Sequence, residues 1–398
     1  MQAYTQLNQN RLTIRGIAAA ALLAGSPFMY GMLFGRGIFL YLAFFFVFAL
    51  LIYALVKNSG RISFQVMTTE KLFCACMLWQ ILAYLWSPTK SGDSLYVMVK
   101  IIVLFLLLST CRYSGKEKQL MLWSTVVVAV FAIYSVLTSN KVFAAEGVDA
   151  MRVSFSFFGV MQDPNYLCFF FLMPVAFLIS GAMDSDGSVM KRLLCGGILL
   201  YLLYGIMRTG SRGGLIGAVT AIAVYLCTFQ KQKWKTILVI VVMTVMVVLA
   251  YDWFISLLPT EIANRFTIDN VLSNGGSNRF STWENYLSAI FSDPFFVLFG
   301  YGNGGGVYHF SYAAHNYLIE TWFEYGLTGI ALLGFFYWSI LKQARKNRNW
   351  VAYAAMWGTL ALAMTLSVGK ILYFWLAVIF ANMMSKERQV GGNAYANP

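Results

Sequence analysis

The chain of 398 residues is 59% hydrophobic and only 11% charged. Soluble globular domains carry about a quarter charged residues, so this composition excludes a soluble domain and indicates a polytopic membrane protein. A nucleic-acid partner for the net charge of +13 is excluded as well, because no soluble segment is long enough to present a basic face.

Apolar runs recur along the whole chain, and each is long enough to cross a bilayer core of about 30 Å as a helix. The first run follows a polar, lightly basic segment and lacks a small-residue cleavage site, so we interpret it as a retained membrane helix rather than a signal peptide. The sequence thus predicts an all-α integral membrane fold in a single polytopic domain, residues 1–398. The twelve predicted spans are 15–35, 37–56, 72–86, 95–111, 120–138, 164–182, 193–207, 213–229, 236–254, 315–341, 350–367 and 371–384. The first two are joined so closely that a re-entrant hairpin is the alternative for them.

The basic residues predict the orientation of these spans. With the N-terminus inside, 19 of the 29 Lys and Arg residues fall in cytoplasmic segments, as the positive-inside rule requires. The two densest clusters, at 231–235 and 342–348, are among them. We therefore expect both termini in the cytoplasm, with most of the net charge facing anionic headgroups. The ten remaining cations run against this bias and should have local reasons for their positions.

Two predicted outer segments, at 139–163 and 255–314, exceed the length of simple turns. The second is the long extracytoplasmic loop between the ninth and tenth spans. It contains NRFSTWENYLSAIF, residues 278–291, whose apolar residues recur at helical spacing. We expect an amphipathic helix there, lying on the outer membrane face.

Arg208 and Arg212 flank Gly210 in MRTGSRGGLIG, a predicted outer turn between the seventh and eighth spans. Guanidinium groups bind phosphate oxygens bidentately, and the start of the next helix adds a positive dipole end. The alternative is that the arginines cap the turn or meet lipid headgroups, and that the glycines serve close helix packing. Arg279 and Arg152 are two further outer arginines. If the four converge on one cavity, they form an anion site the size of a pyrophosphate.

The sixth span begins with DPN, residues 163–165. Asp163 followed by Pro164 predicts a helix N-cap with proline in the first turn. Asn165, directly behind them, is a secondary candidate for a residue that faces a cavity.

His315 opens the tenth span, where an imidazole suits general-base work or hydrogen bonding to a sugar hydroxyl. Glu320 and Glu324 follow on one helix face. Carboxylates inside a span are costly, so we expect Glu324 to pair with a buried cation such as Lys100 or Lys370. Glu320 is a secondary candidate for the site.

The sequence contains no P-loop, HExxH zinc motif or DxD metal motif in a useful context, and its six cysteines all lie within or at the ends of apolar segments. This argues against an ATP-driven pump, a zinc protease and a metal-dependent glycosyltransferase. We expect neither a metal nor another cofactor.

The order of these motifs resembles the bacterial O-antigen ligases and Wzy-type polysaccharide polymerases. DPN, GSRGG, a long outer segment with NRFSTW and LFGYGNG, and then HNYLIETWFEYGLTG follow one another over roughly residues 150–335. His315 and Asn316, nine residues, Gly326, two residues and Gly329 are similar to the ligase signature. Asn316 is therefore a further secondary candidate.

The resemblance implies a GT-C-like fold and a metal-independent, inverting transfer of a glycan from undecaprenyl diphosphate to an acceptor hydroxyl, on the outer side of the bacterial inner membrane. Arg212 and Arg279 would hold the diphosphate, and Arg208 and Arg152 would be further contacts. His315 would activate or orient the acceptor hydroxyl.

One departure from the family pattern bears on the acceptor. The ligases also carry an Arg, three positions, Leu motif, and neither Arg265 nor Arg279 has Leu four places on. This favours a polymerase of O-antigen or capsular repeat units, whose acceptor is another lipid-linked glycan and whose partners include a possible chain-length regulator. Transfer to lipid A core by a ligase is the alternative. A lipid-glycan or solute transporter is the alternative of another class, although the half-to-half repetition typical of transporters is not visible.

Overall fold

The computed structural model describes residues 12–29, 32–33, 36–57, 66–90, 92–138, 142–143, 152–153, 156–157, 160–229, 256–267 and 275–386. The ninth predicted span, 236–254, and the basic cluster at 231–235 lie outside these residues. Each of the other eleven predicted spans overlaps a helix, and six of the helices are long and apolar enough to cross a membrane. The six are α3 (Ile38–Lys57), α5 (Gly92–Ser109), α6 (Gly115–Thr138), α7 (Pro164–Ala182), α8 (Val189–Arg208) and α17 (Tyr317–Lys346). The others are α2 (Ile14–Ala24), α4 (Thr68–Leu82), α9 (Arg212–Phe229), α18 (Trp350–Ala363) and α19 (Leu372–Ser385).

The first predicted span is not one continuous helix, so the prediction of a helix over 15–35 is wrong. Helix α2 ends at Ala24, and a 3-10 turn with Pro27 in its first turn follows. Proline lacks a backbone N–H and clashes with the preceding turn, which ends a helix. A two-residue hairpin of β1 (Met32–Leu33) and β2 (Arg36–Gly37) then leads into α3.

Two more short hairpins add strands that the all-α prediction did not contain. Strand β3 (Val142–Phe143) pairs with β4 (Arg152–Val153), and β5 (Ser156–Phe157) pairs with β6 (Val160–Met161). They connect helices and form no larger sheet among the described residues. The architecture is therefore helical, with strands confined to connections.

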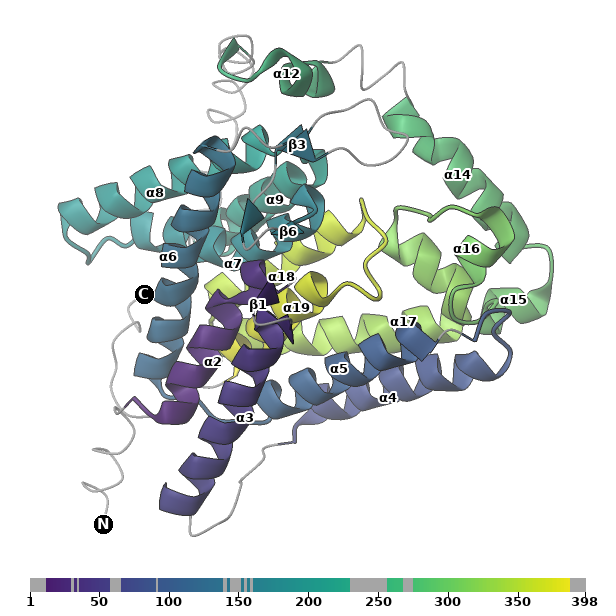
Figure 1. The fold of residues 1–398 in the computed structure, drawn as a ribbon, viewed down its shortest axis with the longest axis horizontal. Coiled ribbons are helices and arrows are strands. Elements are labelled where there is room, and N and C mark those ends of the chain that lie inside the picture. The colour runs from purple at the N-terminus through teal and green to yellow at the C-terminus, as the bar shows by residue number, and fades with distance from the viewer. Residues whose placement is uncertain are drawn as a thin grey trace.

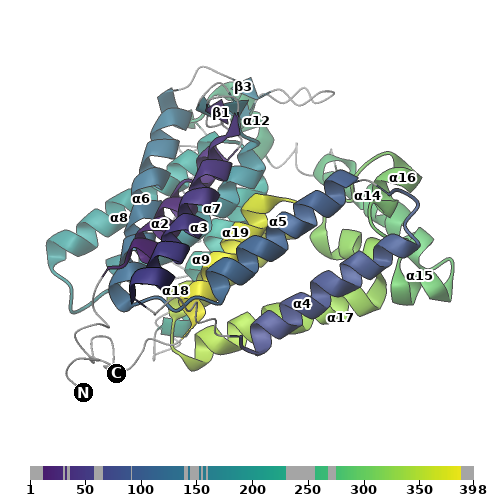
Figure 2. The same ribbon diagram turned by 60° about the horizontal axis from the view of Figure 1, so that its bottom comes forward.

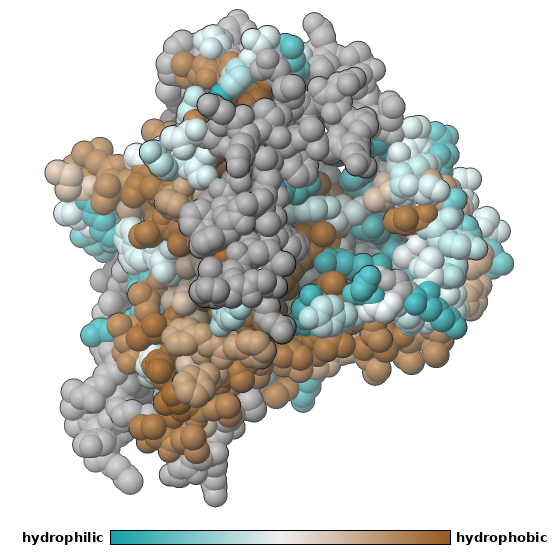
Figure 3. Space-filling model, viewed as in Figure 1, coloured by the Kyte–Doolittle hydropathy of each residue, from teal (hydrophilic) through white to brown (hydrophobic). Residues whose placement is uncertain are grey.

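The hydrophobic core lies around α7, α9, α18 and α19, and the helices outside it expose their apolar side chains. Only 28% of the apolar window of α3 is buried, whereas 67% of that of α7 is. Phe44, Phe48 and Leu55 of α3 are exposed. Figure 3 shows hydrophobic surface along the edge formed by α3, α4 and α5. Since exposed apolar helix faces of this kind are stable in lipid, α3 is a membrane helix at the outer edge of the bundle.

Helices α9 and α18 approach each other backbone to backbone at a pair of glycines. A Cβ on Gly217 would lie 3.0 Å from the carbonyl oxygen of Gly358, and a Cβ on Gly358 would lie 2.6 Å from that of Gly217. Small residues allow this close contact between membrane helices. The glycines after Arg212 thus serve helix packing, which was one of the two alternatives for the GSRGG motif.

Helices α4, α5 and α17 extend side by side toward a group of short helices (Figures 1 and 2). The group comprises α14 (Gly275–Ile290), α15 (Pro294–Phe299) and α16 (Gly305–Phe310), while α12 (Thr260–Phe266) lies apart from it. Tyr286 and Ile290 of α14 form a small core with Ala314 and Phe323. The predicted helix over 278–291 is confirmed as α14, and these apolar residues pack against protein; its position on the outer membrane face stays a prediction.

Charged residues at one end of the bundle, here called the Glu70 end, are joined by close contacts. Lys386 pairs with the fully buried Glu70 at 2.8 Å, and Lys118 donates to the carbonyl of Lys386 at 2.7 Å. Arg15 donates to the carbonyl of Arg112. The sequence assigned the four cations to the cytoplasmic side, and Glu70 directly precedes Lys71, which it assigned to the same side.

Candidate functional site

Helix α17, which carries the end of the His-Asn signature, is broken near its start. Gly326 has φ 66° and ψ −174°, a backbone conformation that is essentially restricted to glycine. A Cβ at this position would also overlap the carbonyl oxygen of Leu298. Glu320 and Glu324 therefore lie on a short helical segment before the break. The predicted span over 315–341 corresponds to α17, but its helix is interrupted at Gly326.

The glycine-rich segment LFGYGNG, residues 298–304, fills this break. The backbone N–H of Tyr301 donates to the carbonyl of Phe323 at 2.7 Å, and that of Gly302 donates to the carbonyl of Glu324 at 2.9 Å. The indole N–H of Trp79 donates to the carbonyl of Tyr325 at 2.9 Å. A broken membrane helix needs such partners for its freed carbonyl groups. The glycine-rich segment is thus a structural clamp on α17.

The side chain of Glu324 also holds the glycine-rich segment against α17. Its Oε1 accepts the backbone N–H of Gly304 at 2.7 Å and lies 3.8 Å from Nζ of Lys370. Pairing of Glu324 with Lys370 was expected from the sequence and is confirmed. Lys100, the other suggested partner, instead lies 4.0 Å from the ring centroid of Tyr96.

His315 stands just before α17 with its side chain exposed. Its φ of +49° is in the left-handed region, which costs a non-glycine residue about 1–2 kcal/mol. Its backbone N–H donates to the hydroxyl of Ser367 at 3.0 Å. Asn316 is the N-cap of α17, and its Oδ1 accepts from the N–H of Leu318 at 3.0 Å and of Ile319 at 3.2 Å. Asn316 is therefore occupied by a capping role.

Arg212 is the first residue of α9, at the end of the turn that the sequence predicted. The preceding residue, Ser211, donates its hydroxyl to Oδ1 of Asn165 at 2.9 Å. Asp163 caps α7, as predicted, and accepts from the N–H of Asn165 at 2.7 Å. The DPN and GSRGG motifs are thus brought together, and Asn165 is the residue that joins them.

Arg279 lies in the second turn of α14, and Trp283 follows it at i+4 on the same helix face. The indole N–H of Trp283 donates to the carbonyl of Ala314, the residue before His315, at 2.8 Å. The hydroxyl of Tyr286 donates to the carbonyl of Tyr312 at 2.7 Å. Burial raises the pKa of the Tyr286 hydroxyl, and the nearby carboxyl groups of α17 raise it further, so the phenol keeps its proton for this bond.

The loop between α18 and α19, residues 364–371, touches both the Arg212 and the His315 segments. A Cβ on Gly213 would overlap the hydroxyl of Thr365, so the start of α9 packs directly on this loop. Two residues further on, Ser367 accepts the N–H of His315. We call Asn165, Arg212, Arg279, His315 and this loop the His315 end. Sequence reasoning missed the loop, and its one signal is the short polar interruption between two apolar runs.

The remaining predicted site residues differ in what surrounds them. Arg208 ends α8, and its Nε is buried without a hydrogen-bond partner in the protein. Arg152 lies in β4, where the structure describes its backbone but not its side chain. Glu320 is half-buried in the first turn of α17 and interacts with the Ser367 hydroxyl. Among the described residues, no group of three or more His, Cys, Asp and Glu side chains is arranged to hold a metal ion.

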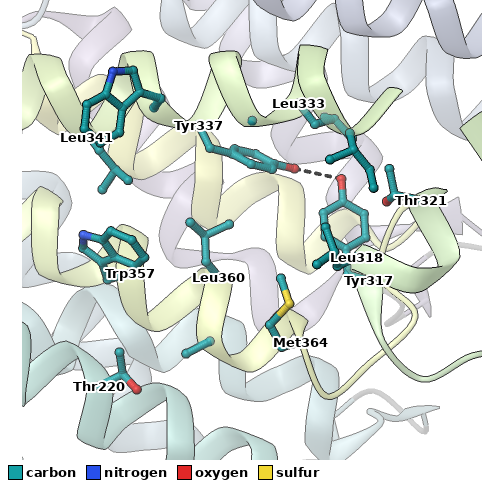
Figure 4. A pocket seen from close by; sticks show the side chains of 14 residues that line it. Thr220, Tyr317, Leu318, Thr321, Leu333, Tyr337, Leu341, Trp357, Leu360 and Met364 are labelled. Carbon is teal, nitrogen blue, oxygen red and sulfur yellow. Dashed lines mark hydrogen bonds between the residues drawn. The ribbon is translucent and has the colours of Figure 1, made fainter. Parts of the chain in front are cut away.

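A largely apolar cavity of about 430 Å³ lies between α9, α17 and α18 (Figure 4). It starts at Tyr317 and Leu318, directly after the His315–Asn316 pair, and extends to Leu341 and Trp357. The hydroxyls of Tyr317 and Tyr337 satisfy each other at 2.8 Å, which leaves an almost wholly apolar wall. The cavity suits a flexible hydrocarbon chain better than a sugar.

These features define a polytopic helical membrane protein in which the start of α9, with Arg212, and the segment with the exposed His315 both contact the loop between α18 and α19. Residues 197–334 match the family model described as O-antigen ligase. Over these residues the match bears out the predicted superfamily, and with the membrane-spanning helices it supports a membrane enzyme of the O-antigen ligase and polymerase type. The matched residues include Arg208, Arg212, Arg279 and His315 but neither Asn165 nor Ser367. No curated protein matches the chain.

Proposed function

We propose that the protein is a metal-independent glycosyltransferase that moves a glycan from undecaprenyl diphosphate to an acceptor sugar hydroxyl. The observation that carries this proposal is the contact of both the Arg212 and the His315 segments with the 364–371 loop. Arginines that hold a diphosphate and a base that meets the acceptor must lie within one substrate's length, and this loop brings their segments together.

In the proposed reaction, the acceptor hydroxyl oxygen attacks the anomeric carbon of the donor from the face opposite the diphosphate. The bond from the anomeric carbon to the diphosphate oxygen breaks, and its electron pair leaves with the diphosphate. His315 takes the proton of the acceptor hydroxyl. Arg212 and Arg279, with Arg208 and Arg152 as further contacts, neutralise the charge on the leaving group. The N-terminus of α9 adds a positive dipole end at Arg212.

The apolar cavity beside α17 supports a donor that is linked to a lipid. It begins one residue after Asn316 and is lined by aliphatic and aromatic side chains. A polyprenyl chain whose diphosphate lies near Arg212 and His315 has an apolar path there. The exposed apolar faces of α3 and its neighbours fit a position in the bacterial inner membrane. By the positive-inside rule, the Glu70 end faces the cytoplasm and the His315 end faces outward.

We propose polymerisation of lipid-linked repeat units as the specific reaction, because the chain lacks the Arg and Leu spacing of the ligases. Ligation to lipid A core is the second candidate, and the family description of the 197–334 match favours it. The two reactions share the donor and differ only in the acceptor.

The test is reconstitution of the purified protein in vesicles with an undecaprenyl-diphosphate-linked repeat unit, with and without lipid A core. Chain growth without core supports a polymerase, and transfer only to core supports a ligase. We expect Arg212→Ala to lower the rate by about 100- to 1,000-fold and His315→Ala by a similar factor. Arg345→Ala removes an exposed guanidinium near the other end of α17 and serves as the matched control. Glycan transfer that survives both His315→Ala and Arg212→Ala would refute the mechanism.

A further inference from the structure

The backbone conformation of His315 is held from outside its own segment. A left-handed φ is unfavourable for histidine, and the N-cap residue Asn316 that follows is fixed in an extended conformation with φ −151°. The direction of the imidazole therefore depends on whatever keeps His315 in place. The bond at 3.0 Å from its N–H to the Ser367 hydroxyl comes from another part of the chain, 52 residues away.

Hydrogen bonds and burial hold the loop that carries Ser367. Val368 is fully buried, and its carbonyl accepts the N–H of Ile371 at 2.9 Å. The indole N–H of Trp375 donates to the carbonyl of Gly369 at 2.8 Å. These bonds fix the residues on the C-terminal side of Ser367, so its hydroxyl is presented from a rigid support.

The Ser367 hydroxyl has a second interaction, with the carboxyl group of Glu320 one turn into α17. Lys370, from the same loop, acts electrostatically on Glu320 and lies 3.8 Å from Glu324. A hydroxyl that accepts from a backbone N–H while facing a carboxyl group has little freedom to rotate.

We propose that Ser367 is a positioning residue for His315, and that Glu320 orients Ser367. The proposal rests on the proposed function, because it assigns to these side chains the task of aiming the imidazole at the acceptor hydroxyl. It also explains why a carboxyl group is kept at residue 320, next to the site and away from the diphosphate arginines. Neither residue touches the reacting atoms.

The kinetic test compares two substitutions at one position in the reconstituted full-length protein. Ser367→Ala should lower kcat by about 10- to 100-fold without a matching change in KM for the lipid-linked donor, since a shift of about 1 Å at a reacting group costs that much. Ser367→Thr keeps the hydroxyl and should restore most of kcat. Ser292→Ala, which removes a hydroxyl that bonds only within its own segment and to Tyr301, is the control.

A double substitution separates positioning from general loss of structure. If Ser367 acts through His315, Ser367→Ala should cause little further loss in the His315→Ala background. An undiminished kcat in Ser367→Ala, or an equal loss in Ser367→Thr, would overturn the proposal. If Ser367→Ala does not yield folded protein, Ser367→Cys keeps the size with a weaker acceptor and carries the same expectation.

A second measurement does not depend on activity. The chain has only two histidines, so labelling with isotopic histidine gives two imidazole signals, one of them from His309 on α16. Ser367→Ala and Glu320→Gln should each shift the His315 signal and leave that of His309 unchanged. If neither signal moves, the positioning role is refuted even when transfer is observed. If wild type transfers no glycan but the His315 signal moves, the proposed function fails and the structural support of His315 stands.

Discussion

The two ends of the helical bundle differ in how their charged groups are paired and in how strained their backbone is. At the Glu70 end, buried charges are matched locally, as in the pair of Glu70 and Lys386. At the His315 end, the backbone is strained and arginines stand at helix termini. Six of the eight described residues with positive φ lie between residues 300 and 326, on either side of His315, and a seventh, Gly210, precedes Arg212. Strain persists only where surrounding structure holds it, and it concentrates at functional sites. The ion pair at the Glu70 end stabilises the bundle, and the stability of the folded bundle holds the strained backbone at the His315 end in place.

Gly326→Ala should give the largest effect on stability, because it attacks the strained end at its most restricted residue. A Cβ there meets both a conformation reserved for glycine and the carbonyl of Leu298, for a combined cost of about 5 kcal/mol. Thermal unfolding in detergent micelles measures the loss. Gly334→Ala is the matched control, since a Cβ on Gly334 of the same helix would meet nothing within 4 Å. Equal melting temperatures for the two variants would show that the break in α17 is not required.

Lys386→Met should be the next most damaging change, with a loss of about 3 kcal/mol. It leaves the carboxylate of Glu70 buried without its cation, which is the costly way to break an ion pair. Glu70→Gln combined with Lys386→Met removes both charges and should recover much of the lost stability. Wild type, Glu70→Gln, Lys386→Met and the double variant form a double-mutant cycle. The same unfolding assay gives the coupling energy between the two side chains. A coupling energy near zero would remove the contrast between the two ends.

Asp184→Asn should have the smallest effect, less than about 1 kcal/mol, because its partner Lys191 is exposed and solvent screens the pair. The hydrogen bond from Lys191 lowers the pKa of Asp184 below its ordinary 3.8. A lowered folded-state pKa contributes stability above the ordinary value and loses it as the pH falls through the lowered value. The melting temperatures of wild type and variant should therefore differ slightly at pH 7 and converge as the pH falls below 3.8. A large difference at pH 7 would show that exposed pairs also matter for this bundle.

Sequence patterns predicted most of the helices, because a lipid bilayer requires long apolar runs. Asp163 as an N-cap follows from local chemistry and was confirmed, and of the two partners suggested for Glu324, Lys370 is the one that pairs with it. The break at Gly326 was not predicted, because its carbonyl partners come from Trp79 and the 298–304 segment. Ser367 was missed for the same reason, since a serine in a short turn has no distinctive spacing.

The glycine contact between α9 and α18 has a consequence for the geometry of the site. Gly217 lies five residues after Arg212, and Gly358 lies nine residues before Ser367. Because the two backbones touch at this pair, the helices cannot slide along each other without losing the contact. The pair therefore fixes, from deep inside the bundle, the position of Arg212 along the helix axes relative to Ser367.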